Sequence, residues 1–68
     1  MLPVGTTVCV VDPLHFYNGR VGQVTHGTTD LNTGTTTYLV EIPTGTGNGT
    51  VLAAVDDSRL YEVEIHNA

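Results

Sequence analysis

The chain of 68 residues contains no lysine and no tryptophan, and its only cations are Arg20 and Arg59. Seven acidic residues leave a formal net charge of −5 at pH 7. A nucleic-acid-binding protein neutralises several phosphates with lysine or arginine, because the release of counterions supplies much of its affinity. Two arginines are too few for such a surface, so we expect no autonomous binding to DNA or RNA.

Cysteine is equally scarce, because Cys9 is the only one and an internal disulfide is therefore excluded. An unpaired cysteine in an extended segment is typical of a reducing compartment. The first residues, Met1 to Pro3, lack the basic and apolar regions of a secretory signal. No run reaches the ~20 apolar residues that span a bilayer. The sequence therefore predicts a cytoplasmic protein without membrane insertion.

The length predicts one small domain over residues 1–68. Folding at this size buries roughly 60% of the unfolded surface, so the core alone supplies only a few kcal/mol. A metal site is not indicated, because His15, His26 and His66 lack the paired spacing of zinc ligands. We expect no metal and no other cofactor, and we favour self-association or a protein partner as the added source of stability.

Extended segments dominate the pattern, because apolar residues alternate with polar ones and no window shows sustained helical periodicity. Near-regular strand spacing with glycine-rich connections indicates a sandwich or barrel. At this length a barrel is favoured, because closure removes exposed strand edges. The predicted strands are Thr6–Val11, Val21–Thr25, Thr36–Ile42, Thr50–Val55 and Tyr61–Ile65. We therefore predict an all-β fold, a small five-stranded SH3-like barrel.

The connections are predicted from their turn-forming residues. His26–Thr35 and Thr44–Gly49 are rich in Thr, Gly and Asn, which indicates solvated loops. Asp56 and the residues that follow it to Leu60 predict one short turn of helix before the last strand. The alternative is a C-terminal helix over Asp57–Ile65. The predicted core consists of Val8, Val10, Val21, Val24, Val40, Ile42, Val51, Leu60 and Val63.

One loop concentrates the bulky side chains, because Phe16 and Tyr17 are two of only four aromatic residues in the chain. Tyrosine, phenylalanine and arginine are common anchors of protein interfaces. The predicted partner-binding residues are His15, Phe16, Tyr17, Arg20 and Arg59. The alternative is that one aromatic ring closes the end of the barrel. No catalytic residues are predicted, since Cys9 adjoins valines and Asp56 and Asp57 fit a turn cap.

The stretch from Gly5 to Val24 resembles the opening of a photosystem I family, the small SH3-like barrel on the stromal side of that complex. The shared features are Gly5, Val8, Val10, Pro13, Phe16, Tyr17, Val21, Gly22 and Val24, with a similar ending from Leu60 to Val63. A small barrel component of the cyanobacterial NDH-1 complex has a similar arrangement of turn residues. The resemblance implies an accessory subunit, although the basic residues with which the photosystem I family docks ferredoxin are absent here.

A second resemblance is to the plasmid-borne type II dihydrofolate reductases, short SH3-like barrels that form a tetramer around one active pore. It is carried by Tyr38 to Glu41, Gly49 to Val51 and Arg59 to Val63. The ligand-binding Val-Gln-Ile-Tyr strand of that family corresponds to Val51, Leu52, Ala53 and Ala54, which lack the glutamine and tyrosine. The Gly-x-Val pattern is also similar to that of KOW-type ribosomal modules.

The function expected from these observations is that of a non-enzymatic accessory or docking subunit that binds a protein partner in a larger assembly. The alternative is a homo-oligomeric barrel enzyme, disfavoured because the chain lacks the positioned polar groups that catalysis requires. A nucleic-acid-associated module of the KOW type is the third possibility, and the net charge opposes it.

Overall fold

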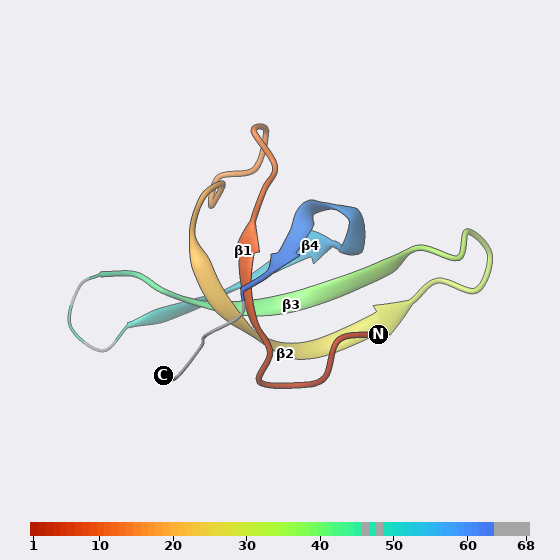
Figure 1. Cartoon of the computed structure of the whole chain (residues 1–68), viewed down its shortest axis with the longest axis horizontal. Coiled ribbons are helices and arrows are strands. Elements are labelled where there is room, and N and C mark those ends of the chain that lie inside the picture. The colour runs from red at the N-terminus through yellow and green to blue at the C-terminus, as the bar shows by residue number, and fades with distance from the viewer. Residues whose placement is uncertain (46, 48, 64–68) are drawn as a thin grey trace.

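The computed structural model describes residues 1–45, 47 and 49–63. Its strands are β1 (Thr7–Val10), β2 (Val21–Thr29), β3 (Thr36–Pro43), β4 (Thr50–Asp56) and β5 (Leu60–Glu62), with a 3-10 turn, η1 (Asp57–Arg59), before β5. All neighbouring strands are antiparallel and form one sheet in the order β4-β3-β2-β1-β5 (Figure 1). The predicted all-β fold, with five strands and one turn of helix before the last, is therefore confirmed.

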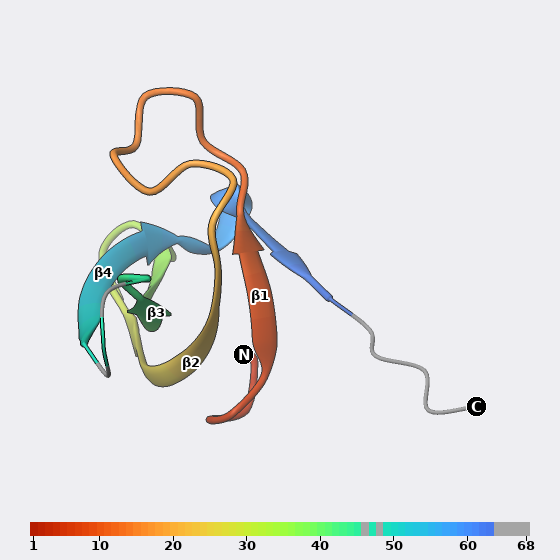
Figure 2. The same cartoon turned by 90° about the vertical axis from the view of Figure 1, so that its left-hand side faces the viewer.

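The sheet is strongly curved, so that one of its faces is concave (Figure 2). The strand β2 contributes to this curvature. The first residues of β2 pair with β1, whereas β2 pairs with β3 from Gln23 onward. A register shift between Val24 and His26 interrupts the second ladder. Such a bulge bends the strand and increases its twist, so β2 contributes to both halves of the curved sheet. The terminal strands of the hydrogen-bonded order are β4 and β5.

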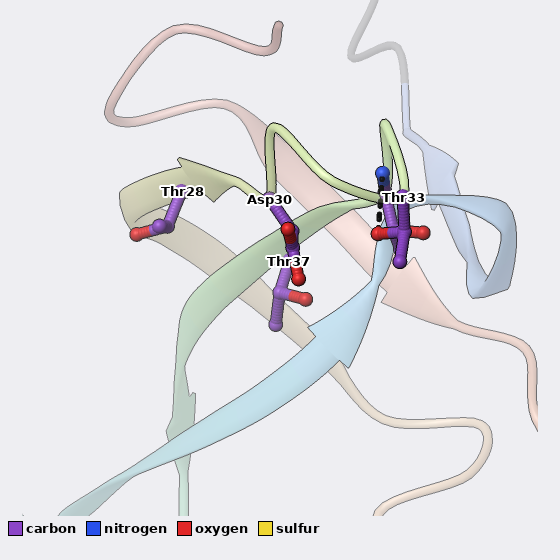
Figure 3. Close-up of a pocket in the computed structure, with 5 residues that line it drawn as sticks. Thr28, Asp30, Thr33 and Thr37 are labelled. Carbon is purple, nitrogen blue, oxygen red and sulfur yellow. Dashed lines mark hydrogen bonds between the residues drawn. The ribbon is translucent and has the colours of Figure 1, made fainter.

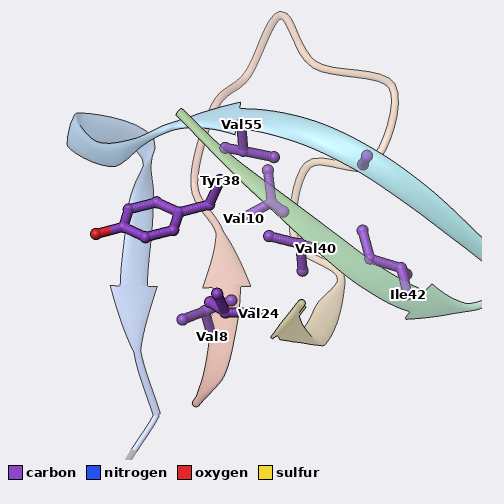
Figure 4. Close-up of a cluster of buried hydrophobic side chains, with 8 residues drawn as sticks. Val8, Val10, Val24, Tyr38, Val40, Ile42 and Val55 are labelled. Atoms are coloured by element: carbon purple, nitrogen blue, oxygen red, sulfur yellow. The ribbon is translucent and has the colours of Figure 1, made fainter. Parts of the chain in front are cut away.

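The core lies on the concave face and consists almost entirely of small branched side chains (Figure 4). Successive strand residues point to opposite faces, which is why Val8 and Val10 are buried while Thr7 and Cys9 are not. Tyr38 is the one buried aromatic residue, and its hydroxyl accepts a hydrogen bond of 2.8 Å from the Leu2 backbone N–H. The buried set is Val8, Val10, Val24, Tyr38, Val40, Ile42, Ala53 and Val55.

The predicted core is correct at Val8, Val10, Val24, Val40 and Ile42, and wrong at Val21. Val21 is 48% exposed because it lies three residues before the inward Val24, on the opposite face of the strand. Gly22 occupies the inward position instead. Three further predicted residues, Val51, Leu60 and Val63, are only half-buried, and the prediction missed Tyr38, Ala53 and Val55.

Two segments differ from the sequence-based expectation. The alternative helix over Asp57–Ile65 is wrong, because a single 3-10 turn is followed directly by β5; positions 64 and 65 of the predicted last strand lie outside the described residues. The segment His26–Thr35 is not all loop, since β2 continues to Thr29. Its threonines pair with threonines of β3, Thr28 with Thr37 and Thr29 with Thr36. Branched side chains favour extended structure, so this hairpin is longer than its polar composition suggests.

Candidate functional site

The loop over residues 11–20 joins β1 to β2 and projects from the end of the sheet (Figures 1 and 2). Internal hydrogen bonds brace it. The Asp12 side chain accepts from the Leu14 N–H (3.1 Å), and the Asp12 carbonyl accepts from the His15 N–H (2.9 Å). The Asn18 side chain accepts from the Asp12 N–H (2.9 Å). These bonds fix the backbone of the interaction loop, as we call residues 11–20.

Hydrogen bonds of the His15 side chain link the interaction loop to β4. Its Nδ1 accepts a hydrogen bond from the Tyr17 N–H (3.1 Å), and its Nε2 lies 3.2 Å from the carbonyl oxygen of Ala54. Nδ1 must be unprotonated to accept, so a neutral ring carries its proton on Nε2 and donates it to Ala54. The ring is half-buried. His15, predicted to contact a partner, is thus placed with both nitrogens turned toward this chain.

The two aromatic residues of the interaction loop have different environments. Tyr17 is half-buried and packs against the core, whereas Phe16 is 90% exposed. Their rings meet edge to face, with centroids 4.8 Å apart. Leu14, at 97% exposure, lies on the same projecting loop. Tyr17 is therefore directed toward the core, while Phe16 and Leu14 face solvent.

The two arginines lie on opposite flanks of the interaction loop. The Arg20 guanidinium donates a hydrogen bond of 2.7 Å to the carbonyl of Pro43, at the end of β3. Arg59 is exposed in η1, and its carbonyl accepts from the Val11 N–H (2.8 Å), on the side of β5. The structure therefore gathers His15, Phe16 and Tyr17 in one loop but does not cluster the cations.

A second surface feature is a hydroxyl-lined hollow of about 530 Å³ at the far end of the β2–β3 hairpin (Figure 3). It is lined by Thr28, Asp30, Thr33, Thr35 and Thr37. All five residues are exposed, and one Asp30 oxygen already accepts from the Asn32 N–H (2.8 Å). The sequence carries a signal for this hollow, because threonines recur at alternate positions from 33 to 37. It offers polar atoms but no apolar anchor.

A smaller groove of about 360 Å³ crosses the outer face of β1, β2 and β3. It is lined by Thr7, Val21, Gly22, Gln23, Glu41 and Pro43. Neither a metal site nor a membrane span is found in the part of the chain that the structure describes. That part holds no cluster of three or more His, Cys, Asp or Glu side chains suited to a metal ion, and none of its helices is long and apolar enough to span a membrane.

Comparison with known proteins adds no relative: no protein family, curated protein or solved structure matches this chain. The resemblances drawn from the sequence therefore stay predictions. The segment that corresponds to the ligand-binding strand of the reductases lies in β4. There the Ala53 side chain is buried in the core, and Leu52 and Ala54 are exposed. None of these side chains carries a polar group for a ligand.

Proposed function

We propose that this protein is a non-enzymatic docking module that binds a protein partner through the tip of its interaction loop. The observation that carries the proposal is the pair Leu14 and Phe16, almost fully exposed on a loop whose backbone is braced by side-chain and main-chain hydrogen bonds. Apolar anchors held in place before binding lose little conformational entropy when they enter a partner's pocket. The exposed anchors and the hydrogen-bonded loop together favour docking.

The charge distribution supports a partner with an acidic border. Both cations of the chain, Arg20 and Arg59, flank the interaction loop, while the chain as a whole is strongly acidic. Arginine is enriched at interfaces, where it pairs with carboxylates. We infer an apolar pocket rimmed by Asp or Glu on the partner. The unpaired, half-buried Cys9 favours a cytoplasmic setting.

The test is site-specific photo-crosslinking in the native host. A photoreactive phenylalanine analogue at position 16 is compared with the same analogue at position 31, because Leu31 is equally exposed (94%) on a different loop. We expect a discrete adduct from position 16 only. The adduct must disappear when Leu14→Ser is added and persist when Leu31→Ser is added. Identical adducts from both positions would contradict the proposal.

A further inference from the structure

A contiguous apolar surface crosses the outer face of three strands, away from the tip of the interaction loop. Cys9 of β1 pairs directly with Val21 of β2 on one side and with Tyr61 of β5 on the other. Because directly paired residues point to the same face, the three side chains form one row. Val11 follows two residues after Cys9, on the same face. Tyr61 is 70% exposed and Val11 54% exposed. We call these four residues the outer patch.

The fold itself does not require the outer patch. An antiparallel sheet with one wet face normally carries polar residues there. The β2–β3 hairpin follows this rule, since threonines occupy the exposed positions 28 and 37. The outer patch does not follow this rule, because it places apolar side chains on the outer face of β1, β2 and β5. A cluster of exposed apolar side chains bounded by polar residues is typical of an interaction surface.

The two ends of the outer patch carry opposite charges. Arg59 stands opposite Val11 at one end, as its backbone bond to the Val11 N–H shows. At the other end, the next outward row contains Thr7, Gln23 and Glu41, which are paired across β1, β2 and β3. The smaller groove on this face, which is lined by Val21 and Glu41 among others, continues the patch toward Glu41. One cation, Arg59, and one anion, Glu41, therefore stand at the two ends of one apolar centre, and Asp57 shares the turn of Arg59.

We propose that a second copy of this chain covers the outer patch, face to face, in a two-fold dimer. In such an interface every contact occurs twice: if one residue of the first copy touches a second residue of the partner copy, the same pair also meets with the copies exchanged. A two-fold axis that passes near Cys9 can set Arg59 of each copy over Glu41 of the partner copy. A surface with opposite charges at its two ends is complementary to a second copy of itself in this orientation. That self-complementarity favours a second copy over an unrelated protein as the occupant.

The small size of the core also favours a second copy of the chain as the molecule that covers the outer patch. Eight buried residues, most of them valine or smaller, form the whole described core. Domains of this length commonly gain stability from association. Packing two outer patches together buries Val21 and Tyr61, which the monomer leaves in water. The outer patch shares Val11 and the neighbouring Arg59 with the base of the interaction loop, but it does not include the exposed tip residues Leu14 and Phe16 that carry the docking proposal.

The first test is sedimentation equilibrium over a concentration series. We expect the wild-type chain to sediment as a dimer and Tyr61→Glu to weaken the dimer by about thirtyfold or more, as for the loss of an interface hot spot. Leu31→Glu adds the same charge at an exposed position outside the patch, so it must leave the dimer intact. A monomer at every concentration, or a dimer indifferent to Tyr61→Glu, overturns the proposal.

The second test is a charge exchange that does not depend on a new residue in the patch. Arg59→Glu and Glu41→Arg each weaken the dimer, and the double variant restores it, because the pair is reversed across the interface. Within one copy Arg59 lies in η1, which follows β4 and contacts β3. Glu41 lies farther along β3, opposite Leu52 rather than opposite Asp56, so an intrachain pair does not explain the rescue. Additive weakening in the double variant overturns the predicted orientation.

The single cysteine supplies an independent readout. Packed sheets lie about 10 Å apart, so a short bismaleimide can join two Cys9 thiols near the axis while a direct disulfide cannot. We expect one linked dimer from wild type and a marked loss of it in Tyr61→Glu. The variant with Leu14→Ser and Phe16→Ser must still form the dimer, which separates a failure of this proposal from a failure of the docking function.

Discussion

At the scale of single residues, His15 shows how a polar side chain in a loop can serve the fold. It accepts from the Tyr17 N–H and donates to the Ala54 carbonyl, so it joins the interaction loop to β4. A bare edge strand presents unpaired backbone groups that can recruit other chains. The His15 ring donates a hydrogen bond to one such group, the Ala54 carbonyl of β4. Its position therefore both orders the loop and shields part of an edge.

We predict that His15→Ala lowers the free energy of unfolding by about 1–3 kcal/mol, because two modest hydrogen bonds are lost. Urea denaturation measures this change. His26→Ala is the matched control, since His26 is exposed on β2 and its loss is expected to stay within about 0.5 kcal/mol. Equal effects of the two substitutions would show that the bonds of His15 contribute nothing.

Gly22 is the second residue whose role depends on its neighbours. A Cβ at this position would contact the Glu41 carbonyl and would lie 2.9 Å from side-chain carbons of Val40 and of Ile42. The strand β3 therefore approaches β2 too closely for any side chain. We expect Gly22→Ala to cost about 2 kcal/mol or more through overpacking.

Gly27→Ala provides the comparison for Gly22→Ala in thermal unfolding. The nearest atoms to a Cβ at position 27 are the Tyr38 ring, at 3.0 Å, and the Met1 sulfur, at 3.2 Å. Met1 is exposed and can move aside. The Gly27 variant should thus melt above the Gly22 variant. The opposite order would mean that β3 shifts readily at Gly22.

At the scale of elements, the strands differ in how firmly they are held. β5 has three residues and pairs only with β1, whereas β3 is paired along its length with β2 on one side and β4 on the other. Elements with few partners open with little free energy, and central strands open only on global unfolding. We predict slow amide hydrogen exchange for Val40 and fast exchange for Tyr61 in NMR measurements. Comparable protection of both would show that β5 opens only with the whole sheet.

The elements also show what the sequence could predict and why the rest escaped it. Strand existence followed from alternation and glycine-rich turns, because both are local properties. The length of β2 did not, since it depends on Thr28 and Thr29 finding partners in β3. The predicted core includes Val21 because the residue is apolar. The neighbouring Val24 and the pairing with β1 decide its face instead.

The same distinction applies to the candidate site. Composition was enough to single out the loop with Phe16 and Tyr17, since aromatics are rare in this chain. Which ring turns inward depends on the packing of Tyr17 against the core. The outer patch was not predicted at all. Its members come from three strands, and only the register that places Cys9 between Val21 and Tyr61 joins them.

At the scale of the whole molecule, folding and association are linked if the outer patch is an interface. A partner that binds only the folded chain raises its stability, and this effect grows with the concentration of the partner. When the partner is a second copy, the melting temperature must rise with total protein. For a domain of this size we expect about 3–5 °C for each tenfold increase in concentration above the dissociation constant.

Tyr61→Glu should make the melting temperature independent of concentration below its raised dissociation constant, while Leu14→Ser and Phe16→Ser leave the slope unchanged. The slope therefore assigns the association to the outer patch or to the interaction loop. It also separates intrinsic stability from association, because the curves of wild type and Tyr61→Glu must converge at high dilution if that tyrosine acts only between copies. Curves that stay parallel would instead give Tyr61 a role within the monomer, where it lies directly opposite the half-buried Cys9 on the adjoining strand.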